Sequence, residues 1–110
     1  MNPNEHQRVV DLLACAYRNI ELDLLSIYRH AGPGADAEAA VIRSLEFSLG
    51  LMCEAIALAD KLGDENTARA TAARAAKVRD AIEDHREQLA AWLEVPILIA
   101  QDEADCSTKH

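Results

Sequence analysis

The chain has 110 residues, half of them hydrophobic, and its net charge is −8. This length fits one domain that buries a core without disulfides or a metal ion. Nucleic acids and anionic membranes are bound through surplus Lys and Arg, so 19 acidic against 11 basic residues argue against both partners. Alanine and leucine are abundant while aromatic residues are scarce, which favours an all-α fold.

The cysteines and the N-terminus indicate an ordinary cytoplasmic protein. Cys15, Cys53 and Cys106 have neither the spacing of a zinc site nor the even number of a disulfide framework. The N-terminal residues MNPNEHQRVV lack an apolar signal core, and no uninterrupted apolar stretch is long enough to span a membrane. The use of alanine and of arginine over lysine suggests a bacterial source.

The first predicted helix covers about residues 4–30. Asn4 is a favourable N-cap after a proline, and apolar residues recur at helical spacing from Val9 to Ile27. The Gly-Pro-Gly turn at 32–34 ends this helix. Three leucines lie outside the apolar row and predict a second contact surface: Leu12, Leu22 and Leu25.

The second predicted helix, residues 36–62, is apolar over most of its circumference. One row contains Val41, Leu45, Leu49, Met52 and Ile56, and a second row contains Phe47, Leu51, Leu58 and Leu62. Such a helix must be covered on more than one side. Gly63 is its expected end.

The third predicted helix covers about residues 65–95, with Asp64 as its N-cap. Pro96 is expected to end or kink it. The apolar triplet 97–99 is expected to form a short segment that covers the chain's own core or docks onto a partner subunit. We therefore expect a domain at 1–100 and an acidic, flexible tail at 101–110.

Both connections are short, so the sequence predicts an all-α, antiparallel, up-down-up three-helix bundle. The second helix has more apolar surface than two neighbours need, which favours a homodimer. The alternative is that the C-terminal segment covers the second row. The predicted partner or dimer interface is Leu12, Leu22, Leu25, Phe47, Leu51, Leu58 and Leu62.

His85 is the one histidine on an apolar row. Together with Tyr17, Tyr28 and Glu21 it forms a possible internal polar site. The alternative reading is a histidine at the edge of the core, hydrogen-bonded to a Tyr, Ser or carboxylate of the first two helices. The Glu-x-x-His pattern of di-iron bundles is absent, so we predict no metal, no cofactor and no catalytic residue.

These features predict a non-enzymatic protein–protein interaction module. The pattern is shared by many small bacterial regulators, adaptors and inhibitors, and we expect a helical homodimer that also binds another protein. The alternative is a ligand- or metal-binding helical bundle with an internal site near His85.

Overall fold

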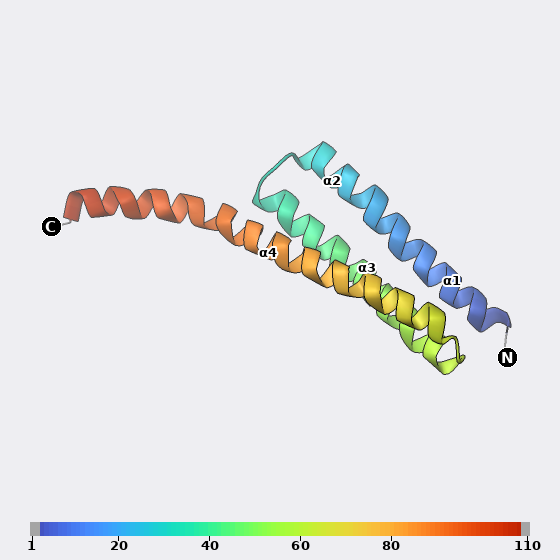
Figure 1. Cartoon of the computed structure of the whole chain (residues 1–110). Coiled ribbons are helices and arrows are strands. Elements are labelled where there is room, and N and C mark those ends of the chain that lie inside the picture. The colour runs from blue at the N-terminus through green and yellow to red at the C-terminus, as the bar shows by residue number, and fades with distance from the viewer. Residues whose placement is uncertain (1–2, 109–110) are drawn as a thin grey trace.

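The computed structural model describes the backbone of residues 3–108 and the side chains of residues 4–94. Within the described backbone, all regular secondary structure is helical. Three long helical segments alternate in direction and lie side by side (Figure 1). This confirms the predicted all-α, antiparallel three-helix bundle.

The first segment is continuous from residue 3 to residue 31 but is not a uniform α-helix. It consists of α1 (Pro3–Arg18), a π-helical stretch η1 (Asn19–Asp23) and α2 (Leu24–Ala31). Its ends agree with the predicted range of 4–30. The sequence did not predict the π-helical stretch, which inserts wider hydrogen-bonded turns into the helix.

The central element is α3 (Ala35–Lys61), which packs against the first segment on one side and against α4 (Glu65–Thr108) on the other. No Cα atom of the first segment lies within 8 Å of a Cα atom of α4 in the described residues. The Cα atoms extend over 73 × 28 × 14 Å, which is the shape of a layer. Side chains still join the first segment to α4, because Arg74 of α4 lies over the Tyr17 ring, and α3 is the helix that packs closely against both.

This arrangement explains why α3 is apolar over most of its circumference. Val41, Leu45 and Met52 are buried, whereas Leu51 and Leu58 of the second row are half-buried and pack on core residues. Helix α1 covers part of the second apolar row of α3, because Leu58 packs on the core cluster that contains Val9. The side chains of 97–99, the expected cover in the alternative reading, lie outside the described residues.

The core is a row of three clusters along α3. Val9, Ala55, Ala59 and Ala68 form the cluster near the second turn. Ala16, Met52 and Ala75 form the middle one. Val41, Ile42, Leu45 and Ile82 form the cluster near the first turn. Two small residues in the first half of α4, Ala68 and Ala75, are buried against α3 in these clusters.

The predicted end of the third helix near residue 95 is wrong, because α4 continues through Pro96 to Thr108. A proline inside a helix removes one backbone donor and crowds the preceding turn, and both effects can be absorbed by bending. Figure 1 shows α4 curving and extending past the other helices. The short C-terminal segment expected after Pro96 is thus a continuation of this helix, while the flexibility of 101–110 stays a prediction.

The turn between α3 and α4 matches its sequence signals. Gly63 has φ +78°, and the backbone N–H groups of Gly63 and Asp64 donate to Asp60 and Ala59 at 3.1 and 2.9 Å. This is the Schellman pattern at a helix end. Asp64 then caps α4, because Thr67 N–H donates to its Oδ1 at 3.2 Å. The hydrogen bond from the Thr67 side chain, followed by this backbone hydrogen bond, lowers the pKa of the Asp64 carboxyl.

Among the described residues, no helix combines the length and the apolarity that a membrane crossing needs.

Candidate functional site

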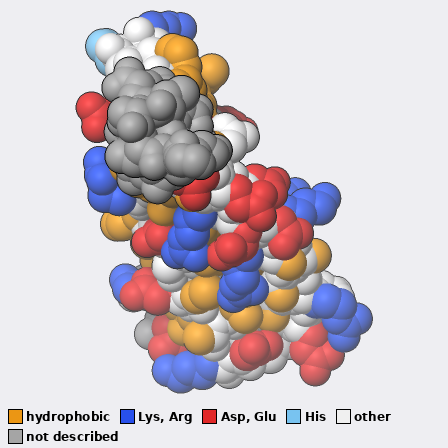
Figure 2. All heavy atoms as spheres, turned by 90° about the vertical axis from the view of Figure 1, so that its left-hand side faces the viewer, with side chains coloured by type: hydrophobic (Ala, Val, Ile, Leu, Met, Phe, Trp, Pro, Cys, Tyr) orange, Lys and Arg blue, Asp and Glu red, His pale blue; other side chains and the backbone are white. Residues whose placement is uncertain are grey.

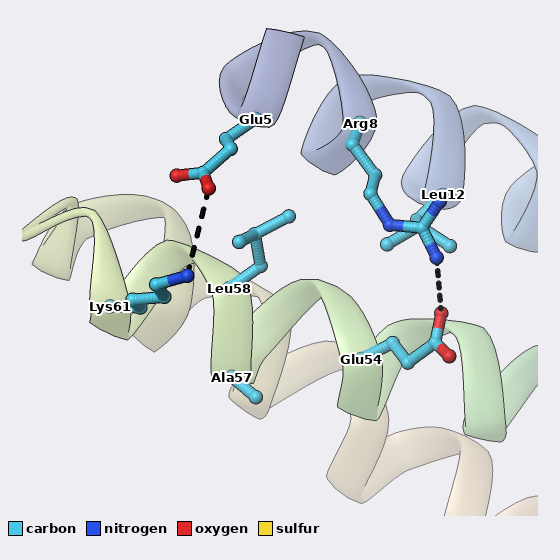
Figure 3. A pocket seen from close by; sticks show the side chains of 7 residues that line it. All are labelled: Glu5, Arg8, Leu12, Glu54, Ala57, Leu58 and Lys61. Atoms are coloured by element: carbon cyan, nitrogen blue, oxygen red, sulfur yellow. Dashed lines mark ion pairs between the residues drawn. The ribbon is translucent and has the colours of Figure 1, made fainter. Parts of the chain in front are cut away.

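An open groove runs between α1 and α3 on the side away from α4. Its first part has a volume of about 480 Å³. Figure 3 shows two ion pairs that bridge the helices here, Arg8 to Glu54 and Lys61 to Glu5, each at 3.6 Å. The apolar lining consists of Leu12, Ala57 and Leu58.

The groove continues along α1 into a second part of about 470 Å³. This part shares Arg8 and Leu12 with the first part and adds Cys15 and Leu51, with Asn4, Gln7 and Asp11 on its rim. We call the two parts together the α1/α3 groove. Three of the predicted interface residues therefore line one continuous surface: Leu12, Leu51 and Leu58.

Two large apolar side chains lie beyond the far end of this groove. Phe47 is 59% exposed and Leu22 is 57% exposed. The Ser44 hydroxyl donates to Asp23 Oδ2 at 3.4 Å, so α3 and η1 meet at this level. Leu22 precedes Asp23 in η1 and Phe47 follows Ser44 by three residues, so both exposed side chains are near this junction in the sequence. We call Phe47 and Leu22 the apolar knobs.

The other two predicted interface residues lie elsewhere. Leu25 is 64% exposed, but it follows Asp23 by two residues and so lies on nearly the opposite side of the helix. Leu62 is the C-cap residue of α3 and packs against the core cluster near Gly63. Of the seven predicted interface residues, three line the groove, two are the apolar knobs, and Leu25 and Leu62 lie apart from both.

The residues of the predicted internal polar site come together only in part. His85 of α4 and Tyr28 of α2 both contact Glu38 of α3, which is only 4% exposed. The Nδ1 atom of His85 donates to Glu38 Oε2 at 2.6 Å, and the Tyr28 hydroxyl donates to the same carboxylate. This internal polar cluster joins all three helical segments near the first turn.

Tyr28 has a raised pKa. Partial burial is the largest cause, followed by the negative charge of Glu38 and the hydrogen bond to it. Each of these favours the neutral phenol. The cluster is therefore one carboxylate held by two donors, as the alternative reading of His85 as a hydrogen-bonded residue at the core edge predicted.

Tyr17 and Glu21 do not join this cluster. The Arg74 guanidinium lies over the Tyr17 ring, with 5.0 Å from its Cζ atom to the ring centroid. Glu21 is exposed within η1. Tyr17 lies near the C-terminal end of α1 and packs on the middle core cluster, whereas His85 lies beside the start of α3.

Sequence reasoning missed Glu38, although a signal was present. Glu38 lies three and seven residues before Val41 and Leu45, so it shares their inward-facing row. A carboxylate on such a row requires buried donors, and His85 is an available one.

A second polar contact that the sequence did not indicate lies at η1. The Asn19 side-chain amide donates to Ser44 O, Ser44 Oγ and Ser48 Oγ at 3.1, 3.2 and 2.8 Å. Ser48 is fully buried. This contact fixes the π-helical stretch against α3.

The described residues contain no group of three or more His, Cys, Asp and Glu side chains arranged to hold a metal ion. Within the same part of the chain, every buried side-chain nitrogen and oxygen has a hydrogen-bond partner. Charged side chains of both signs alternate with apolar ones on the face shown in Figure 2.

Comparison of the chain with protein-family models, with curated proteins and with solved structures found no match.

Proposed function

We propose that the chain is a non-enzymatic protein–protein interaction module: a small acidic regulator, adaptor or inhibitor of bacterial type that acts as a homodimer and binds another protein. The observation that carries the proposal is the exposure of Phe47 on the central helix, next to a groove lined by leucines.

The location of Phe47 supports this proposal more than its exposure alone. Single exposed apolar side chains are common on soluble proteins, and Val10, at 57% exposed, is an example on another side of α1. Phe47, by contrast, lies one turn from Leu51 and three turns from Leu58 on the same side of α3, and both leucines line the groove. A continuous apolar strip with a polar rim is typical of a docking surface.

The net charge of −8 bears on the choice of the second partner. Acidic flanks attract a basic protein surface over the range of the Debye length and raise the rate of encounter. We therefore propose that the other protein bound by this module presents a basic surface.

The internal polar cluster supports the alternative function, a ligand- or metal-binding bundle. A buried carboxylate beside a histidine and a tyrosine is a common element of such sites. In this chain, however, both donors already point to Glu38, which is what a structural contact between three helices requires. Native mass spectrometry of the purified protein separates the two, because the alternative predicts an additional bound mass that His85→Ala removes.

The test of the proposed function is the native mass of two matched variants, Phe47→Asp and Val10→Asp. The two positions are equally exposed, so neither substitution disturbs the core. We expect the Val10→Asp protein to remain a dimer and the Phe47→Asp protein to become a monomer. Equal masses for the two variants would contradict the assignment of the surface.

A further inference from the structure

We infer that the end of α4, residues 92–108, is the element that docks onto the other protein bound by this module, and that this partner presents an apolar surface bordered by Lys and Arg. We call residues 92–108 the projecting segment. The inference rests on the proposed function and adds the place of the contact and the chemistry of the partner surface.

The projecting segment begins where α3 no longer lies alongside α4. His85 contacts Glu38 in the first turn of α3, and α3 begins at Ala35. Trp92 follows His85 by two helical turns, so it lies beyond the first residue of α3. Figure 1 shows α4 continuing past the turn that joins the first segment to α3. The segment spans roughly 25 Å at 1.5 Å per residue.

The inward-facing apolar row of α4 continues into this segment and becomes exposed there. Ile82 is buried, and Leu89 is half-buried against the core cluster near the first turn. Trp92 and Leu93 follow Leu89 by three and four residues, so they lie on the same side of the helix. They are 43% and 55% exposed. The row therefore leaves the bundle with a tryptophan and a leucine exposed side by side.

The sequence that follows has the composition of a helix that another surface covers. Positions 95–100 read VPILIA, and the backbone stays helical through them. A helix that is apolar all round is buried in folded proteins, and most helical stability comes from packing. Pro96 removes one backbone donor as well. Since α2 and α3 do not extend alongside this part of α4 (Figure 1), the covering surface belongs to another molecule.

The charge of this end of the chain selects the kind of partner. The last basic residue before it, Arg86, is paired with Glu46 and Glu83. Positions 87–108 contain no Lys, Arg or His, and they contain five acidic residues: Glu87, Glu94, Asp102, Glu103 and Asp105. A partner that borders its apolar surface with Lys and Arg is attracted on both sides of the apolar stretch. The same segment of a second copy carries the same negative charge and is repelled.

The experiment uses a synthetic peptide with the inferred chemistry. The probe is an amphipathic helix of leucine and lysine with all leucines on one face, and the control peptide has glutamate in place of each lysine. Trp92 is the only tryptophan of the chain, so its fluorescence reports on the projecting segment. We expect the leucine–lysine peptide to shift the Trp92 emission to shorter wavelength and the leucine–glutamate peptide to leave it unchanged.

Two matched variants separate a contact at the projecting segment from attraction by the net charge. Leu93→Asp and Val10→Asp replace apolar side chains that are 55% and 57% exposed, and each adds one negative charge. The affinity of each protein for a dye-labelled leucine–lysine peptide is measured by fluorescence anisotropy. We expect Leu93→Asp to weaken binding about tenfold or more, as the loss of a central apolar contact does, and Val10→Asp to leave it unchanged.

The inference is overturned if the leucine–lysine peptide does not bind, if it binds without a shift of the Trp92 emission, or if the two variants bind it equally well. A Leu93→Asp protein that loses a dimeric native mass, while Val10→Asp keeps it, would show that a second copy covers the segment and would overturn the inference too. The proposed function is tested separately by the native masses of Phe47→Asp and Val10→Asp, so the two failures are distinguishable.

Discussion

The contact between His85 and Glu38 yields the most specific stability prediction. Replacing His85 by alanine removes a donor 2.6 Å from a carboxylate that is 4% exposed. Tyr28 remains as a donor to that carboxylate. The substitution therefore leaves Glu38 buried, negatively charged and less well satisfied than before.

The size of the effect follows from the burial of the two partners. A hydrogen bond to a charged group contributes about 1.5–3 kcal/mol, and breaking a fully buried ion pair costs more. The His85 side chain is 22% exposed, so water can reach the space that it vacates. We therefore expect His85→Ala to lower the free energy of unfolding by about 2 kcal/mol.

Urea denaturation followed by circular dichroism measures this loss, at one protein concentration because self-association contributes to apparent stability. Glu38→Ala and the double variant complete a cycle, with an expected coupling of about 1–2 kcal/mol between the two side chains. Glu46→Ala is the matched control. Its pair with Arg86, at 3.0 Å, lies at the half-exposed surface, and we expect no measurable change.

Two results would refute this reasoning. One is a His85→Ala protein whose stability matches that of the parent. The other is a double variant whose loss equals the sum of the two single losses, because additive losses mean that the side chains do not interact.

Three further predictions concern the helix contacts and the turn. Asn19→Ala should lower the free energy of unfolding by about 1–2 kcal/mol, because Ser48 loses its buried hydrogen-bond partner. A variant that unfolds in urea at the same concentration as the parent protein would contradict this expectation. Gly63→Ala should lower the free energy of unfolding by about 1 kcal/mol, because φ is +78° at this position and alanine is strained there. An unchanged free energy of unfolding in the same assay would contradict this strain. In a Tyr17→Phe protein, the ultraviolet titration of Tyr28 should have a midpoint above the ordinary pKa of about 10. Because the folded-state pKa is raised, the neutral phenol stabilises the fold below pH 10 and this contribution is lost as the pH rises through that midpoint; a midpoint at the ordinary value would contradict the contact with Glu38.

The helices and turns could be predicted because their determinants are local. A period of 3.6 residues, a Gly-Pro-Gly turn and the pair Gly63–Asp64 identify the helix boundaries without knowledge of the fold. The helix end predicted at Pro96 is wrong, because a proline disfavours a helix locally but does not forbid one. The π-helical stretch has no signature in composition, because it depends on how Asn19 meets α3.

The site could be predicted less well, because it depends on how the helices are placed around α3. Periodicity indicates which side chains share a face, but it does not reveal that α1 half-covers Leu51 and Leu58 while Phe47 stays exposed. It also does not reveal that His85 of α4 meets the start of α3, where Glu38 is the partner. Such distances are set by tertiary packing, on which the sequence pattern carries little information.

The native mass of the untagged parent protein, measured beside that of Phe47→Asp, tests the central claim most directly. We expect a dimer for the parent and a monomer for the variant, because Phe47 is the large exposed apolar side chain on the central helix. A parent protein that is a monomer at every concentration measured, with a Phe47→Asp variant of identical behaviour, would contradict the proposal that this module acts as a homodimer.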